Sequence, residues 1–458
     1  MFHFIETIEQ ERRNYRRMFV GVDKKIPLAN GKYIKGINFD NAATTPPFRS
    51  VMKEIQKFAP WYSSVHRGKG YKSVITSEVY EKGRDVIKRF VQADKELDTI
   101  IYTKNSTEAI NVLAHILSQE GRNDVILATG MEHLANDLPW RDRFSVDYIE
   151  VDPLGRLSLA DLKNKLVKHQ GKVKLVTVTG ASNVTGYLNL IHAMAAMAHE
   201  YGALIHVDGA QLTPHHIVDL KPHSSPEHID FFTFTGHKMY APFGIGVLIG
   251  MKEVFRDKVP LLKGGGSVRL VSTDFVEWDE APAKEEAGTP NIMGIVALMT
   301  AIRTLESLGM DTVHEYESNL VSFLFRGLKS IPHCHLFGPD DKEPDEERVS
   351  LISFYLEGIN HHAVAQALSD EFGIAVRSGW FCAYPYVQKL LQVSQQDLQT
   401  YRQNPDLPGP GLVRISLGLY NRYHEVAIFL DALDKIASNR DYYQQKYDIN
   451  YGICGRRK

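Results

Sequence analysis

Polar and ionisable side chains recur where apolar segments of this sequence end. The segments DTIIYT, VKLVTVT, ALIHVD and DFFTFT are apolar enough to form buried strands. In an open α/β sheet, ligands bind beyond the carboxyl ends of the strands. We therefore expect the residues that end or follow these segments to form one shared site. They are Asn105, Ser106, Thr107, Asn183, Asp208, Thr235, His237 and Lys238.

Lys238 and Asp208 together indicate chemistry on a pyridine ring. A lysine at the end of a buried strand is costly to keep charged, so its pKa falls and its neutral amine can attack a carbonyl. A carboxylate at the end of another strand, such as Asp208, can keep a pyridine nitrogen protonated. Ser106 and Thr107 stand at a strand-to-helix turn, where free N–H groups and the helix dipole hold a phosphate. The combination predicts pyridoxal 5'-phosphate as the cofactor.

Each of these residues alone has an ordinary structural explanation. An aspartate after a strand is commonly a turn residue, a lysine commonly lies on the surface, and a serine at a helix start is commonly an N-cap. Only their occurrence together favours a site. The His-Cys-His run at 333–335 is weaker, because a lone tripeptide does not supply the ligands of a zinc site. We expect a strand or turn there and no metal.

The elements around these residues alternate between strand and helix as far as about residue 290. Strands that are apolar along their whole length and alternate with helices predict an α/β fold with a mostly parallel, doubly covered sheet. Beyond residue 290, two long helices precede a mixture of strands and helices that is typical of a smaller α+β domain. We expect an N-terminal arm at 1–30, a large domain at 31–290 and a small C-terminal domain at 291–458.

Length and composition exclude several classes of protein. A chain of 458 residues is too long for one ordinary core. Lys and Arg total 53 against 55 for Asp and Glu, without the basic excess of a nucleic-acid binder. The sequence contains no apolar run long enough for a membrane helix and no secretory signal. Its three cysteines are too few for a disulfide framework, which favours a cytoplasmic protein.

Eight motifs carry a resemblance to a known family. In order they are SSVHRG, NSTEAIN, MEHLANDLPW, ASNVTG, HVDGAQ, TGHKMYAPFGIGVL, EAGTPN and VRSGWFCAYP. Between FDNAATTPP and VRISLGLYN, the sequence resembles the class V aminotransferase family of fold-type I pyridoxal-phosphate enzymes. Within that family it is most similar to the group II cysteine desulfurase and selenocysteine lyase branch. The resemblance implies a mostly parallel seven-stranded sheet in the large domain, with the smaller α+β domain following it.

The resemblance also implies roles for the residues that face the cofactor ring. Lys238 would hold the cofactor as a Schiff base, and Asp208 would face the pyridine nitrogen. Gln211 would lie near the phenolic oxygen of the ring. His133 would stack on the ring and move protons, and Asn183 would contact cofactor or substrate.

The same resemblance implies how the phosphate and the substrate are held. Arg414 would clamp the carboxylate of a small amino-acid substrate as a bidentate fork, with Arg377 close by. The phosphate would be held by Ser106, Thr107, Thr235 and His237, and by Thr289 from a neighbouring subunit. The last contact implies a homodimer with shared sites.

Cys382 decides which reaction we expect. It lies five residues after Arg377, the spacing of the group II branch, in which a thiolate takes sulfur from cysteine and leaves alanine and a persulfide. The persulfide would then pass to an acceptor protein. Two alternatives stay open: Cys382 is a buried structural cysteine, or the chain runs another class V reaction. That reaction would be transamination, epimerisation or C–S or C–C cleavage on a different amino acid, without Cys382.

Three features depart from the family pattern. Trp380 and Phe381 stand where the branch often has a histidine before the cysteine. Asn105 replaces a glycine of the phosphate loop, which we expect to be tolerated in a left-handed turn. The segment 386–413 is longer than is typical of the branch, and we expect two helical pieces and a Pro/Gly loop beside the site. We expect the acidic stretch 339–348 to be a solvated loop, and Cys454 to be a spectator thiol near the chain end.

Overall fold

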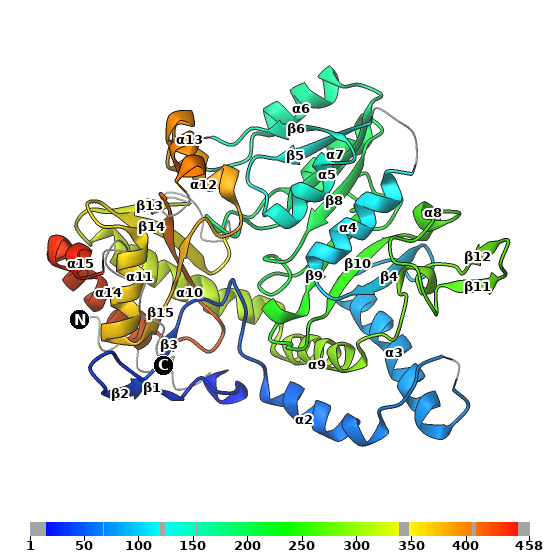
Figure 1. Cartoon of the computed structure of the whole chain (residues 1–458), viewed down its shortest axis with the longest axis horizontal. Helices are drawn as coiled ribbons and strands as arrows, with labels where there is room; N and C mark the ends of the chain where they lie inside the picture. Colours follow the sequence, from blue (N-terminus) through cyan, green and yellow to red (C-terminus); the bar gives the residue numbers. More distant parts are fainter. Residues whose placement is uncertain are drawn as a thin grey trace.

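The computed structural model describes residues 15–66, 68–119, 124–152, 154–338, 348–404 and 409–447. Figure 1 shows a large lobe built on one extended sheet and a smaller lobe beside it. Residues 1–14 of the N-terminal arm, most of the acidic stretch and Cys454 lie outside the described residues. From Tyr15 onward the arm packs on its own chain, where Arg16 forms a buried ion pair with Glu425, with 2.7 Å between Nη1 and Oε1.

A seven-stranded sheet forms the centre of the large lobe, in the order β4-β10-β9-β8-β7-β5-β6. Only β10 runs antiparallel to its neighbours in this sheet, so the prediction of a mostly parallel sheet is confirmed. The strands are β4 (Asp98–Thr103), β5 (Val125–Thr129), β6 (Ser145–Ile149), β7 (Val173–Thr179), β8 (Leu204–Asp208), β9 (Phe231–Thr235) and β10 (Gly246–Met251).

Both faces of this sheet are buried, because successive side chains of a strand point to opposite faces. In β4, Ile100 and Tyr102 belong to one core cluster, whereas Ile101 belongs to another that contains the apolar face of α4. Figure 1 shows helices on both sides of the sheet. The helices of this lobe are α2 (Arg49–Phe58), α3 (Tyr71–Phe90), α4 (Ser106–Leu117), α5 (Leu138–Arg141), α6 (Leu159–Lys168), α7 (Ile191–Glu200), α8 (Lys252–Phe255) and α9 (Ile292–Leu308).

The small lobe is an antiparallel sheet with helices packed on it. Its four strands follow the order β13-β14-β17-β16, and β13, β14 and β17 share a separate core cluster with the helices. The strands are β13 (Cys334–Phe337), β14 (Leu351–Leu356), β16 (Arg377–Gly379) and β17 (Leu412–Ser416). The helices are α10 (Met310–Lys329), α11 (His361–Phe372), α14 (Tyr423–Ser438) and α15 (Arg440–Lys446).

Two segments pack in a different lobe from the one that the expected domain boundaries assign to them. The buried side chains of α9 belong to the core of the large lobe, although α9 follows residue 290. Ile37 and Phe39 belong to the core of the small lobe, and β3 (Ile37–Asn38) pairs with β15 (Ile374–Ala375). We therefore propose that the large domain continues through Leu308 and that the chain around β3 belongs with the small domain.

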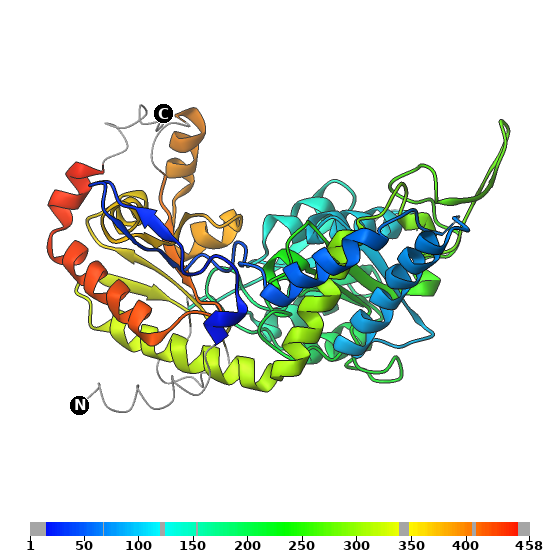
Figure 2. The same ribbon diagram turned by 90° about the horizontal axis from the view of Figure 1, so that it is seen from below.

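Shorter elements connect the two lobes or project from them. The strands β11 (Val268–Val271) and β12 (Val276–Trp278) form a hairpin that extends from the end of the large lobe (Figure 2). The expected helical pieces of the long segment are α12 (Tyr384–Leu390) and α13 (Gln395–Gln403). The remaining elements are β1 (Lys25–Pro27), β2 (Tyr33–Lys35) and the 3₁₀ turns η1 (Tyr15–Met18), η2 (Ala59–Trp61), η3 (Leu134–Asn136), η4 (Gly236–Lys238) and η5 (Ala283–Glu285).

Among the described residues, no single helix combines the length and the apolar character of a membrane span. Helices α9 and α10 meet that test only when taken together, across a bend of 79°.

Candidate active site

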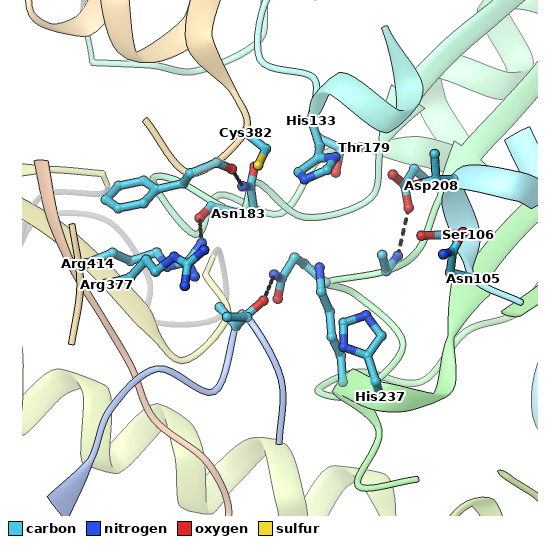
Figure 3. A pocket seen from close by; sticks show the side chains of 17 residues that line it. Asn105, Ser106, His133, Thr179, Asn183, Asp208, His237, Arg377, Cys382 and Arg414 are labelled. Carbon is cyan, nitrogen blue, oxygen red and sulfur yellow. Dashed lines mark hydrogen bonds between the residues drawn. The ribbon is translucent and has the colours of Figure 1, made fainter. Parts of the chain in front are cut away.

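A pocket of about 270 Å³ opens where the central strands end and the small lobe meets the large one (Figure 3). Strands β4, β7, β8 and β9 each lead into a lining residue, as the sequence pattern predicts. The lining residues are Ala42, Ala43, Asn105, Ser106, Thr107, His133, Thr179, Asn183, Asp208, Ala210, Gln211, His237, Lys238, Arg377, Phe381, Cys382 and Arg414.

The fold therefore gathers most of the predicted site residues around one cavity, and two of them lie elsewhere. Thr235 is buried at the end of β9 and its hydroxyl donates to the carbonyl of Ile245 at 3.2 Å. Thr289 is exposed and does not line the pocket of its own chain. Its expected contact is with a neighbouring subunit, so it stays a prediction.

Lys238 ends the 3₁₀ turn η4 that follows β9. Burial lowers the pKa of its amine to about 8, with Asp208 opposing that shift and Arg414 adding to it. At pH 7 an amine with this pKa is about 10% neutral, whereas an ordinary lysine is about 0.04% neutral. The turn thus supplies a usable fraction of nucleophilic amine at neutral pH.

Asp208 is the last residue of β8 and is buried in the pocket wall. One carboxylate oxygen, Oδ1, accepts from the N–H of Ala210 at 3.0 Å. Burial raises the pKa of this carboxyl, and the charge of Lys238 opposes the shift. A cation placed against the carboxylate would offset its burial cost. The next position must be a glycine because Gly209 packs on Phe232, whose ring atom Cζ would lie 2.1 Å from an added Cβ.

The N-terminus of α4 forms one end of the pocket and is suited to bind an anion. Asn105 caps this helix, and its side chain accepts from the N–H of Glu108 at 2.9 Å. Its φ of −167° is extended, so the expectation of a left-handed turn is wrong, because a capping residue takes a β conformation. Gly246 lies so close to Asn105 that an added Cβ would meet the backbone carbon at 2.3 Å. The first helical N–H groups and the hydroxyls of Ser106 and Thr107 are suited to hold a phosphate.

His133 lines the pocket wall between the N-terminus of α4 and Cys382 (Figure 3). Its Nδ1 accepts from the N–H of Ala135 at 3.0 Å, which leaves the proton of a neutral ring on Nε2. Burial, with the charges of Lys238 and Arg414, lowers the pKa of this imidazole to about 4. His133 is therefore a neutral, flat, aromatic surface at physiological pH, as stacking on a cofactor ring requires.

Arg414 in β17 and the exposed Arg377 in β16 form the cationic end of the pocket. Arg414 is buried, and its Nη1 donates to the carbonyl of Asn183 at 2.8 Å. Its Nη2 lies 3.4 Å from Oδ1 of Asp40, and Arg377 lies 3.6 Å from the other carboxylate oxygen. Burial lowers the pKa of Arg414 to about 10, so the guanidinium stays charged at neutral pH. The pair is suited to bind a carboxylate.

Cys382 lies on the loop between β16 and α12, at the mouth of the pocket, and its side chain is exposed. Two carbonyl bonds attach this loop to the large lobe: Phe381 O accepts from Asn183 Nδ2 and Cys382 O from Leu134 N, both at 2.7 Å. Phe381 and Cys382 both have left-handed φ values, of 51° and 54°. Two consecutive non-glycine residues in this region cost free energy, and such strain is concentrated at functional sites. The structure thus disfavours the alternative of a buried structural cysteine.

The segment from Asp40 to Thr45 connects several parts of the site by hydrogen bonds and ion pairs. Ala42 O accepts from Gln211 Nε2 at 2.8 Å, and His237 O accepts from Thr45 N at 3.0 Å. Asp40 lies between the two arginines. The FDNAATTPP motif contains these residues, but the motif alone does not indicate which distant elements they contact.

The residues present fit pyridoxal phosphate. The phosphate end, the aromatic wall and the buried carboxylate correspond to the phosphate, ring face and ring nitrogen of that cofactor. Two buried polar atoms of the pocket have no hydrogen-bond partner among the described residues, namely Gln211 Oε1 and Arg414 Nε. Orphaned buried polar atoms are uncommon in folded proteins and indicate a missing ligand.

Comparison with known proteins agrees with the geometry. The model of the family "Aminotransferase class-V" matches residues 37–429. This chain belongs to the class-V aminotransferase family. It is 35% identical to a probable cysteine desulfurase of Staphylococcus aureus over 381 residues, which are 81% of this chain and 88% of that protein. It is also 32% identical to a cysteine desulfurase of Haloferax volcanii over 87% of this chain and 88% of that protein.

Two solved structures resemble the whole fold of this class-V family member. The apo structure of a cysteine desulfurase from Thermococcus onnurineus superimposes with a TM-score of 0.79 at 32% identity, covering 91% of this chain and 98% of that one. A cysteine desulfurase from Escherichia coli gives a TM-score of 0.77 at 28% identity, covering 93% of this chain and 98% of that one. The fold-type I prediction is confirmed.

We predict a distinctive pH dependence for loading of the cofactor. Because the pKa of Lys238 is about 8, attachment of pyridoxal phosphate to cofactor-free enzyme should quicken about tenfold between pH 6 and 7. It should level off just above pH 8. Stopped-flow absorbance measures this rate, with Nα-acetyl-lysine as a control whose own rate keeps rising to about pH 10. A protein rate that also climbed to pH 10 would contradict the lowered pKa.

Proposed function

We propose that this enzyme is a cysteine desulfurase that takes sulfur from L-cysteine, or selenium from selenocysteine, and releases alanine. The single observation that carries the proposal is the position of Cys382. Its thiol lies at the mouth of the same pocket that contains Lys238, Asp208 and the two arginines. A transaminase or epimerase has no use for a thiol there.

We propose that the pocket residues divide the work between cofactor and substrate. Lys238 holds the cofactor covalently, Asp208 pairs with its ring nitrogen, and the N-terminus of α4 binds its phosphate. His237 adds a side chain at the phosphate end of the pocket. The bound cofactor would supply an electron sink for the substrate carbon. Thr235, the residue before η4, links the end of β9 to the start of β10 through its bond to Ile245.

The substrate would be positioned by its carboxylate. Arg414 is fixed on one side by Asn183 and on the other by Asp40, which leaves its buried Nε–H group to bind the incoming anion. Arg377 adds charge at the solvent side. The cavity is small enough to favour amino acids with short side chains.

Cys382 would then act on the sulfur atom. Its thiolate attacks the substrate sulfur, a new S–S bond forms and the C–S bond breaks. The electron pair of that bond stays with the substrate carbon, which takes up a proton to become the methyl group of alanine. Lys238, with an amine pKa of about 8, is suited to move that proton. The product on the protein is a Cys382 persulfide, and the step needs no external oxidant.

The decisive experiment is a panel of amino acids given to the purified holoenzyme with a reductant. We expect L-cysteine or L-selenocysteine to yield alanine together with sulfide or selenide in equal amounts. Aspartate, serine and alanine should yield no product above background. Turnover of an amino acid without sulfur or selenium, at a rate comparable to that of cysteine, would instead support the alternative class V reactions.

We further propose that the active unit is a homodimer and that a separate protein accepts the sulfur. Thr289 is exposed and so is free to contact a neighbouring subunit, as the resemblance implies for a shared phosphate site. Because two hydrogen bonds attach the Cys382 loop to the large lobe, the persulfide stays at the pocket mouth. An acceptor therefore has to reach the cysteine beside the neighbouring helices α12 and α13.

A further inference from the structure

Three potential metal-binding side chains meet at the end of the large sheet that lies away from the pocket. Asp98 is the first residue of β4, whereas the pocket lies beyond the last residue of the same strand. Five residue steps of about 3.3 Å separate the two ends by about 17 Å. His223 and His228 come from the segment between β8 and β9. The ligand atoms of Asp98, His223 and His228 all lie within 4.8 Å of one another.

His228 is oriented as a metal-bound histidine is. It is buried, with 3% of its surface exposed, and its Nδ1 lies 3.0 Å from Leu220 O and 2.8 Å from Lys221 O. Carbonyl oxygens only accept hydrogen bonds, so we assign the ring proton to Nδ1 and the lone pair to Nε2. That Nε2 atom is buried and has no hydrogen-bond partner among the described residues. A carbonyl bond at one nitrogen with a free lone pair at the other is the usual arrangement around a metal.

Asp98 and His223 complete the group. Oδ1 of Asp98 lies 3.0 Å from Nε2 of His223, and Oδ2 accepts from the N–H of Asp94 at 2.8 Å, so the carboxylate is held in place. The ring centroids of His223 and His228 are 4.0 Å apart. Asp98 is 1% exposed, whereas the His223 side chain is 19% exposed. The group is therefore buried except on the side of His223, where an ion can enter.

The surrounding backbone keeps these side chains in position. Ile229 N donates to Leu220 O at 2.9 Å, which closes the loop, and Leu220 N donates to Val91 O at 3.0 Å, which fixes the loop on the end of α3. Lys88 is the nearby cation, and its ammonium group is bonded to the main-chain carbonyls of Asp94, Lys95 and Asp98. Among the described residues, no lysine or arginine side chain forms an ion pair with the Asp98 carboxylate, which remains available to a metal.

We propose that Asp98, His223 and His228 bind a divalent transition metal, with Zn²⁺ as the preferred ion. Two imidazoles and one carboxylate form a ligand set that suits Zn²⁺, whereas Mg²⁺ and Ca²⁺ prefer oxygen ligands only. The fourth position faces the exposed side of His223 and takes a water molecule. The ion joins the loop between β8 and β9 to the turn before β4, and its role is to stabilise the fold far from the pocket.

The test uses untagged holoenzyme that has been stripped of metal with a chelator and titrated with ZnCl₂ in a calorimeter. We expect wild type to bind one Zn²⁺ per chain at a saturable site and to melt at a higher temperature with Zn²⁺ than without it. MgCl₂ should do neither. His223→Ala and Asp98→Asn should weaken binding by at least about tenfold and remove the thermal shift.

Two controls make the result decisive. His335→Ala removes an exposed histidine of β13 and should bind Zn²⁺ as wild type does. His223 is partly exposed and the change at Asp98 is isosteric, so both variants should keep the wild-type cofactor absorbance and circular dichroism, which would show that they fold. The proposal would be overturned if wild type bound no Zn²⁺, or if wild type, His223→Ala and Asp98→Asn all bound it equally well. The three side chains would then form only a hydrogen-bonded cluster.

Discussion

Replacing Cys382 by alanine is expected to lower release of sulfide from L-cysteine by about 10³-fold or more, while the absorbance of the bound cofactor stays at the wild-type level. The size of the effect follows from the role of the thiolate as the group that accepts sulfur, since no other described thiol lines the pocket. The cofactor should remain because Lys238, Asp208 and the N-terminus of α4, which would hold it, are all kept in this variant.

Cys334 provides the matched control for this variant. It lies in β13, outside the pocket, where burial raises the pKa of its thiol to about 12. A thiol with that pKa has almost no thiolate at neutral pH, so Cys334→Ala should release sulfide as wild type does. Alkylation with iodoacetamide should likewise modify Cys382 and spare Cys334. Full sulfide release by Cys382→Ala would show that this cysteine is not the nucleophile and would favour the other class V reactions.

Replacing Lys238 by alanine is expected to remove covalent attachment of the cofactor and to lower turnover of every amino acid substrate by about 10³-fold or more. The effect should reach all substrates because Lys238 is the only lysine among the described pocket residues. Borohydride reduction of wild type followed by peptide mapping should place the cofactor label on the peptide that contains Lys238. The variant should carry no label.

The control for this variant is Lys53→Ala, which removes an exposed lysine from α2. It should load cofactor and turn over cysteine at the wild-type rate. The two active-site variants test two separate parts of the proposal, the cofactor site and the reaction. Loss of cofactor in Lys238→Ala tests the cofactor site, whereas Cys382→Ala tests the reaction. A label that persists in Lys238→Ala would contradict the assignment of the cofactor lysine, whatever reaction the enzyme performs.

The hydrophobic pattern of the sequence is sufficient to predict the sheet and the residues at its edge. Strands such as β7 and β9 are buried at nearly every position and consist mainly of apolar residues and threonine, which identifies them without a structure. Because ligand-binding residues follow the carboxyl ends of such strands, Asp208 and Lys238 could be assigned to one site from the sequence alone. The sequence is sufficient for these two predictions because each depends on residues that are close together in the chain.

Only the tertiary structure decided how segments far apart in the chain meet. Asp40 lies 374 residues before Arg414, yet the two form an ion pair in the pocket, and Asp98 meets His223 across 125 residues. The left-handed backbone of Phe381 and Cys382, without a glycine at either position, has no sequence signal either. Contacts of this kind depend on how two lobes and their loops pack, which local propensity and periodicity do not specify. The sequence determined which chemical groups are available, and packing decided which of them act together.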